Sequence, residues 1–152
     1  MIIQEKTIEE ARKAIDKAFA KKNKNEIIIV QARDAEFNRK ILENKKISVL
    51  LSPELEGKDK LKERGSGLNE ILCDIAAKNK IKIGINLNEI TNKEPREKAI
   101  LLSRIRQNIK LCKKSKTEIE ILDKSEHDKR DILSLLMSLG ADTKLAKEAA
   151  EN

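Results

Sequence analysis

Short apolar runs alternate along the chain with stretches in which apolar residues recur every three or four positions. The first pattern is typical of strands buried in a parallel sheet, and the second of helices with one buried face. Strands are predicted over 27–30, 47–51, 81–87 and 117–122, with 1–4 as a short fifth candidate. Helices are predicted over about 8–19, 34–41, 68–77, 95–115 and 127–139, with a last one near the C-terminus. Thr7, Asp34 and Asp142 are expected to cap helices that follow them.

The regular alternation of strand and helix predicts an α/β fold with a mostly parallel sheet and right-handed crossovers. The sequence has no internal repeat and no low-complexity linker, so we expect one domain over residues 1–152. A complete eight-stranded barrel typically needs more than about 200 residues. With 152 residues, this chain is too short for a complete one.

The stretch Arg64-Gly65-Ser66-Gly67-Leu68-Asn69 forms a glycine-punctuated turn before one of the predicted helices. Ser66 is expected to cap that helix. The turn places Arg64 at a helix N-terminus, where backbone N–H groups and the helix dipole favour an anion. The alternative is a capped turn with a solvated arginine, because Gly-Ser-Gly turns are common.

The charge of the chain is strongly basic and unevenly distributed. Lys and Arg number 33 against 26 Asp and Glu, and residues 78–116 hold twelve Lys or Arg against three Glu. This balance favours a polyanionic partner. Phe19 and Phe37 are the two aromatic residues, which argues against base-stacking platforms, so we expect RNA contacts mostly to phosphate and sugar.

The predicted helix over 95–115 separates its apolar and cationic residues. On a helical wheel its apolar side chains occupy one side, and five cations fall within a sector of roughly 100° on the other. These five are Arg96, Arg106, Lys110, Lys113 and Lys114. A solvated face usually interleaves Glu with Lys, so the clustering favours RNA contact over a merely soluble surface. Arg104 points elsewhere on the wheel and is a separate candidate.

Other residue types narrow the range of functions. Cys73 and Cys112 lie inside predicted helices without ligand spacing, as expected of small buried hydrophobes in a reducing compartment. His127 is the single histidine. No acid–base or metal constellation is visible, so we expect neither a catalytic nor a metal site. With no membrane-length apolar run and no signal-peptide core, the expected location is cytoplasmic.

Five stretches in register resemble the archaeal ribonuclease P protein component 3 family, the counterpart of the 30-kilodalton subunit of the eukaryotic enzyme. They are 33–39, 47–53, 64–69 with the strand ending at 88, 99–111, and 128–133 with Ser138-Leu139-Gly140. The chain departs from the family at Ser52, where His before Pro is common, and at Leu122-Asp123-Lys124-Ser125. The family is usually built as a full barrel, and this chain lacks a match to its first strand–helix unit or units. The resemblance therefore implies a shortened or incomplete TIM-type barrel, either open or completed by a partner.

The resemblance implies a noncatalytic protein subunit of the ribonucleoprotein that removes the 5′ leader of precursor tRNA. Its implied partners are ribonuclease P RNA, precursor tRNA and a small ferredoxin-like protein subunit. No cofactor is implied for the chain itself, whereas Mg²⁺ is expected for the RNA-based holoenzyme. Carried over residue by residue, Arg64, Ser66 and Asn69 form the turn that meets RNA or partner, and Arg33 and Arg39 lie at the ends of an earlier unit.

Several alternatives stay open. A generic basic RNA-binding module of the translation apparatus would keep the charge argument alone. A metal-dependent phosphoesterase-like barrel would need several His and Asp ligands at strand ends. For Asn38, Asn69, Asn86 and Asn88, the alternative to RNA contact is local bonding to exposed backbone, which we favour for Asn86 and Asn88.

Overall fold

One parallel sheet forms the centre of the fold. The computed structural model describes residues 1–23, 25–122 and 127–151. Its strands are β1 (Ile2–Ile3), β2 (Ile29–Gln31), β3 (Val49–Leu51), β4 (Lys82–Asn86) and β5 (Ile119–Leu122). Each strand pairs in parallel with the next, in the order β1-β2-β3-β4-β5. This confirms the α/β class and the short first strand, and sequential parallel pairing is the order of a TIM-type barrel.

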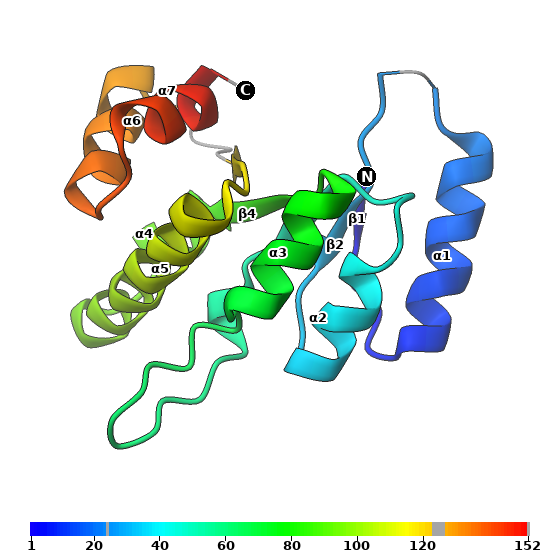
Figure 1. Cartoon of the computed structure of the whole chain (residues 1–152), viewed down its shortest axis with the longest axis horizontal. Coiled ribbons are helices and arrows are strands. Elements are labelled where there is room, and N and C mark those ends of the chain that lie inside the picture. The colour runs from blue at the N-terminus through cyan, green and yellow to red at the C-terminus, as the bar shows by residue number, and fades with distance from the viewer. Residues whose placement is uncertain (24, 123–126, 152) are drawn as a thin grey trace.

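The longer helices cover one face of this sheet. Figure 1 shows four of them side by side in chain order from right to left: α1 (Ile8–Lys21), α2 (Ala35–Leu42), α3 (Glu70–Asn79) and α5 (Pro95–Ser115). The pair α6 (Lys129–Ser138) and α7 (Thr143–Glu151) packs together, and α7 contacts β5. The fold therefore has a sheet layer and a helix layer, with the last two helices at the β5 end.

Three of the helix starts follow the predicted capping chemistry. The Thr7 hydroxyl accepts a hydrogen bond from the Glu10 backbone N–H and donates one to the Glu10 carboxylate, which is a capping box. Asp34 accepts from the Phe37 N–H at 2.9 Å, and Asp142 accepts from the Leu145 N–H at 2.9 Å. These bonds satisfy backbone donors that a helix start leaves open.

Alternation along the strands divides the core between the two faces of the sheet. Val30, Leu50 and Ile83 belong to the large cluster that joins the sheet to the helices. Ile29, Val49 and Leu51 form a smaller cluster on the opposite face, so β2 and β3 are buried on both faces, as expected of apolar runs in a parallel sheet. A Cβ on Gly84 would lie 2.8 Å from Val49 Cγ1, so glycine at this point lets the β3 side chains pack against β4. Cys73 and Cys112 are buried, as expected.

Two short elements were not expected from the sequence. A 3₁₀ turn, η1 (Pro53–Leu55), follows β3, and α4 (Leu87–Thr91) follows β4. The Asn86 side chain accepts from the Asn88 N–H at 3.1 Å, so the chain turns into α4 one residue before the expected strand end. The predicted local role of Asn86 is confirmed by this bond. In the described part of the chain, no helix combines the length and apolarity needed to cross a membrane.

The first of the two C-terminal helices starts later than predicted. Asp128 caps α6 by accepting from the Arg130 N–H at 2.7 Å, so that helix begins at Lys129. The departure from the family noted at 122–125 falls mostly on residues 123–125, which lie outside the described residues.

Candidate nucleic-acid interface

The exposed side of α5 borders a cationic groove. The opposite side of the helix is buried in the core through Leu101, Ile105 and Ile109. The groove encloses about 810 Å³ between α5, the start of α3 and the end of α6. Its residues are Glu70, Ser103, Arg106, Gln107, Lys110, Leu111, Lys113, Lys114, Leu139 and Gly140. The structure thus brings together four of the five cations that the wheel placed on one side, and we call this surface the α5 groove.

Most of the charge in the α5 groove is uncompensated. Arg106, Lys110 and Lys113 are exposed, and none forms an ion pair with a residue that the structure describes. Lys114 Nζ lies 2.6 Å from Glu70 Oε1, and this hydrogen bond raises the pKa of Lys114. Because both partners are largely exposed, solvent and salt screen the pair. The α5 groove therefore presents a concentrated positive potential.

Arg96 and Arg104 lie apart from the α5 groove. Arg96 is exposed in the first turn of α5, ten residues before Arg106, which corresponds to about 15 Å along a helix axis. Arg104 is 12% exposed, with its Nε 3.0 Å from Asp59 Oδ1 and its Nη1 donating to the Glu54 carbonyl at 3.0 Å. The structure gives Arg104 a bracing role between α5 and the segment that follows β3.

The turn at 64–69 differs from its predicted form in the residue that caps α3. Asn69, not Ser66, is the N-cap, and its side chain accepts from the Leu72 N–H at 2.9 Å. Gly67 has a φ of +79°, and a Cβ there would overlap the Pro53 carbonyl, so the chain passes close to η1 before the helix begins. Ser66 is buried, and its hydroxyl donates to the Leu68 carbonyl at 3.4 Å. The capping prediction for Ser66 is therefore wrong, and its side chain supports the turn from inside.

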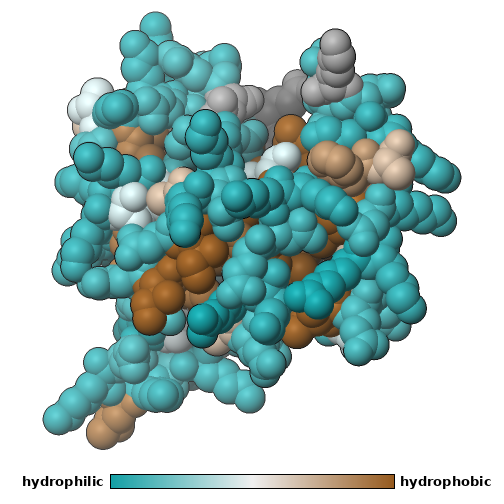
Figure 2. Space-filling model, turned by 45° about the vertical axis from the view of Figure 1, so that its right-hand side comes forward, coloured by the Kyte–Doolittle hydropathy of each residue, from teal (hydrophilic) through white to brown (hydrophobic). Residues whose placement is uncertain are grey.

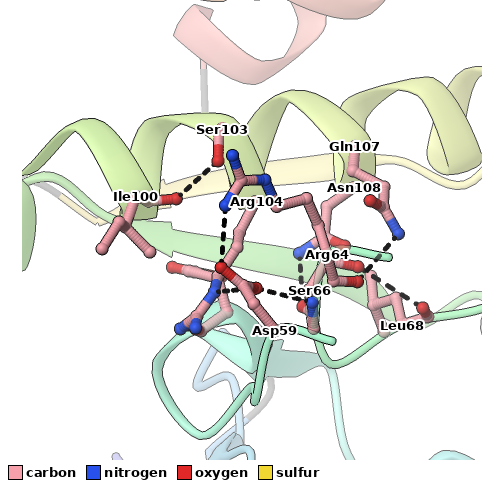
Figure 3. Close-up of polar contacts among 11 residues, drawn as sticks. Asp59, Arg64, Ser66, Leu68, Ile100, Ser103, Arg104, Gln107 and Asn108 are labelled. Carbon is pink, nitrogen blue, oxygen red and sulfur yellow. Dashed lines mark hydrogen bonds and ion pairs between the residues drawn. The ribbon is translucent and has the colours of Figure 1, made fainter. Parts of the chain in front are cut away.

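Arg64 is held by a carboxylate of its own loop. Its Nη1 lies 2.9 Å from Asp59 Oδ2, and the side chain stays 54% exposed. Asp59 also accepts from the Gly65 N–H at 2.8 Å, and this bond, with those from Arg64 and Arg104, lowers the pKa of Asp59 to about 2. Figure 3 shows these contacts around Asp59, with Arg104 reaching down from α5. Arg64 is thus positioned with part of its guanidinium facing solvent.

A second hollow lies beside this turn. It encloses about 320 Å³ and includes the first residue of α2 and the cap of α3. Its cationic lining residues are Lys58, Lys60 and Arg64, with Glu63 as its acidic one. The hollow therefore combines cationic residues with a helix N-terminus, which is the arrangement predicted to favour an anion. RNA contact by Arg64 and Asn69 stays a prediction.

Arg33 and Arg39 have different surroundings. Arg33 donates to the Gln4 carbonyl at 2.8 Å and the Glu5 carbonyl at 3.3 Å, and it pairs with Glu56 at 3.2 Å, so it ties three segments together. Arg39 pairs with Glu43 one turn later at 3.4 Å and remains 62% exposed. Their role toward RNA stays a prediction, and Arg39 is the more accessible of the two.

Two further asparagines, Asn38 and Asn69, form local hydrogen bonds with the backbone, which is the alternative to RNA contact. Asn38 is fully buried and exchanges two 2.8 Å hydrogen bonds with the backbone of Arg33. Asn69 caps α3. These bonds explain the residue type at both positions without an RNA contact.

A buried carboxylate, which the sequence did not indicate, lies behind the turn. Glu54, in η1, is 2% exposed, and its Oε2 has no hydrogen-bond partner among the described residues. Burial raises the pKa of Glu54 to about 7, against the opposing effects of its own backbone and of Arg104. Ser52, two residues earlier, has a φ of 50°, and its buried Oγ likewise has no hydrogen-bond partner among the described residues. The charged segment 54–63 carries no periodic pattern that could have signalled this burial.

Comparison with known proteins finds relatives of one kind. No protein-family model matches the sequence. Ribonuclease P protein component 3 of Methanococcus vannielii is 32% identical over 108 residues, which cover 70% of this chain and 44% of that protein. The corresponding protein of Methanocaldococcus jannaschii is 29% identical over 119 residues, covering 78% of this chain and 49% of that protein. Over most of its length, the chain is thus similar to ribonuclease P protein component 3 of archaea.

Two solved structures resemble the fold of this chain. A chain in a cryo-EM structure of archaeal ribonuclease P with mature tRNA superposes with a TM-score of 0.79 and 25% identity. That match covers 99% of this chain and 63% of the other. A crystal structure of an uncharacterized protein shares the fold, with a TM-score of 0.60 and 9% identity. The chain thus spans less than half the length of the component 3 relatives described above.

Within residues 1–23, 25–122 and 127–151, no cluster of side chains that could hold a metal ion is found. Among the described residues, no group of three or more His, Cys, Asp or Glu side chains converges. The α5 groove and the hollow beside Arg64 are lined by cationic side chains, which suits them to electrostatic binding of an anion.

Proposed function

We propose that this chain is a protein subunit of ribonuclease P that assists the catalytic RNA in removing the 5′ leader of precursor tRNA. The observation that carries the proposal is the α5 groove, in which Arg106, Lys110 and Lys113 have no ion pair with any described residue. The component 3 relatives and the likeness to a chain of archaeal ribonuclease P support it.

The mechanism follows from polyelectrolyte chemistry. Each Lys or Arg that neutralises a phosphate releases condensed counterions, which favours binding and makes it salt-dependent. Neutralised phosphates can also pack closely, so the chain stabilises the folded RNA. In this proposal the RNA performs the hydrolysis, and Mg²⁺ acts in the RNA-based holoenzyme rather than on the chain.

The proposed partners follow from the family. They are ribonuclease P RNA, precursor tRNA within the complex, and a small ferredoxin-like protein subunit. The proposed location is the cytoplasm. Arg33, Arg39, Arg64, Asn69 and Arg96 are proposed as additional RNA contacts outside the α5 groove, whereas the burial of Ser66 and Arg104 favours a supporting role for these two.

Reconstitution tests the proposal. Ribonuclease P RNA from an archaeon is combined with its other protein subunits, and cleavage of precursor tRNA is measured with and without this chain at limiting Mg²⁺. We expect the chain to increase the cleavage rate. No increase, together with recovery of ribosomal RNA instead of ribonuclease P RNA when the tagged chain is purified from an archaeal extract, would favour a generic RNA-binding module.

A further inference from the structure

Residues 57–65 form a projection that we call the finger. It leaves the body between η1 and α3, and Figure 1 shows it as the long loop at the lower left. The backbone of Lys60 and Glu63 exchanges hydrogen bonds of 2.8 and 3.3 Å, which closes the end of the finger. Between them lies Leu61, whose side chain is completely exposed. In Figure 2 the same projection is hydrophilic along its length, with a hydrophobic spot near its end.

Polar contacts brace the base of the finger against α5. Asp59 accepts from the Gly65 N–H, Arg64 and Arg104 at 2.8–3.0 Å. Gln107 donates to the Arg64 carbonyl at 3.4 Å, and Asn108 donates to the Ser66 carbonyl at 3.0 Å. A Cβ on Gly57 would overlap the Gly65 carbonyl, so the two arms of the finger lie in contact. A loop that is braced at its base but buries nothing at its end is suited to contact a partner.

The outward charge of the finger is mainly positive. Lys58, Lys60 and Lys62 are exposed and form no ion pair with a described residue. Asp59 is matched by two arginines, which leaves Glu63 as the acid without such a pair. Lys58 and Lys60 also line the 320 Å³ hollow with Arg64. Phosphate suits this hollow because its lining combines three cationic residues with the N-terminal ends of α2 and α3.

The finger adjoins the α5 groove through a shared residue. Gln107 lines the groove and also donates to the base of the finger. An RNA that lies in the groove would therefore meet the finger next. A phosphate with an unpaired base beside it offers a partner for each part of the finger, whereas a regular duplex keeps its bases stacked.

We propose that the finger binds an unpaired nucleotide of the RNA, with its phosphate in the hollow and its base against Leu61. This inference rests on the proposed function. Leucine and other apolar side chains of minor-groove binding proteins insert between base steps, so an aliphatic contact with the face of a base has precedent. The role falls to leucine here because Phe37 is buried and Phe19 lies on α1, far along the helix layer from the finger (Figure 1).

Site-directed crosslinking tests the proposal. Cys73 and Cys112 are 0% and 1% exposed, so a thiol-directed benzophenone will label Leu61→Cys selectively. The labelled chain is assembled with archaeal ribonuclease P RNA and the other protein subunits, irradiated, and mapped by primer extension. The control is Met137→Cys, at an exposed position on α6. We expect a crosslink from position 61 to single-stranded nucleotides that the control does not give. A crosslink to a protein subunit, to base-paired nucleotides or to nothing would overturn the proposal.

Affinity measurements separate this inference from the proposed function. Leu61→Ala should weaken binding to ribonuclease P RNA about fivefold, equivalent to ~1 kcal/mol, and leave binding to a perfect RNA duplex unchanged. The matched control is Ile71→Ala, which removes an exposed apolar side chain from α3. If the wild-type chain fails to bind ribonuclease P RNA, the proposed function fails. If it binds and Leu61→Ala binds equally well, the finger inference alone fails.

Discussion

The α5 groove makes a quantitative prediction about salt. The variant Arg106→Ala, Lys110→Ala, Lys113→Ala removes the three groove cations that have no ion pair with a described residue. Each phosphate contact contributes roughly 0.9 to the slope of log affinity against log salt for a duplex, and roughly 0.7 for a single strand. Losing three contacts should therefore flatten the slope by about 2 to 3 units. Between 50 and 200 mM salt, the affinity advantage of the wild type should shrink about 20- to 40-fold.

The assay is filter binding of ribonuclease P RNA over a KCl series. The matched control is Lys13→Ala, Lys17→Ala, Lys21→Ala, which removes three exposed cations from α1 and gives the same change in net charge. All six side chains are exposed, so circular dichroism should show the same melting temperature for both variants. A flattening of less than one unit, or equal flattening in the α1 control, would refute the reasoning.

Three further variants test individual parts of the account. The wild type should lose stability as pH rises from about 4.5 to 7, because in this range the folded state still holds the Glu54 proton that the unfolded state releases. Glu54→Gln should abolish this loss. Melting temperatures across pH 4–8.5 measure it, and an equal loss in the variant would contradict the assignment to Glu54. Asn69→Ala should cost about 1 kcal/mol of unfolding free energy in urea titrations, since it removes the cap of α3; an unchanged free energy of unfolding would contradict this role. Arg64→Ala should lower precursor-tRNA cleavage while leaving the melting temperature nearly unchanged, because the side chain is half exposed; a large thermal destabilisation would show that the turn is purely structural.

The long helix shows what periodicity alone can predict. In α5, Leu101, Ile105 and Ile109 repeat over an unbroken helix of 21 residues, so the buried side and the cationic side follow directly from spacing. A helical wheel, however, shows only the angle of a side chain around the axis and not its position along the axis. Arg96 shares an angular sector with Arg106 but lies about 15 Å away along that axis, and so misses the groove.

The rest of the site depends on tertiary contacts. Ser66 and Asn69 are both good capping residues, and the choice is made by the close approach of Gly67 to Pro53, which no local pattern reveals. Glu54 lies in a charged segment and is buried by packing that brings Arg104, fifty residues later, onto its backbone. The bracing of the finger likewise joins Asp59 to a helix 45 residues away.

Cleavage by a holoenzyme reconstituted with variant chains tests the central claim most directly. At subunit concentrations near the binding midpoint, we predict that the α5 groove variant lowers the rate of precursor-tRNA cleavage about tenfold or more, that excess protein restores it, and that the α1 control stays within about twofold of wild type. Equal rates for the groove variant and the wild type would contradict the claim that this surface binds the RNA.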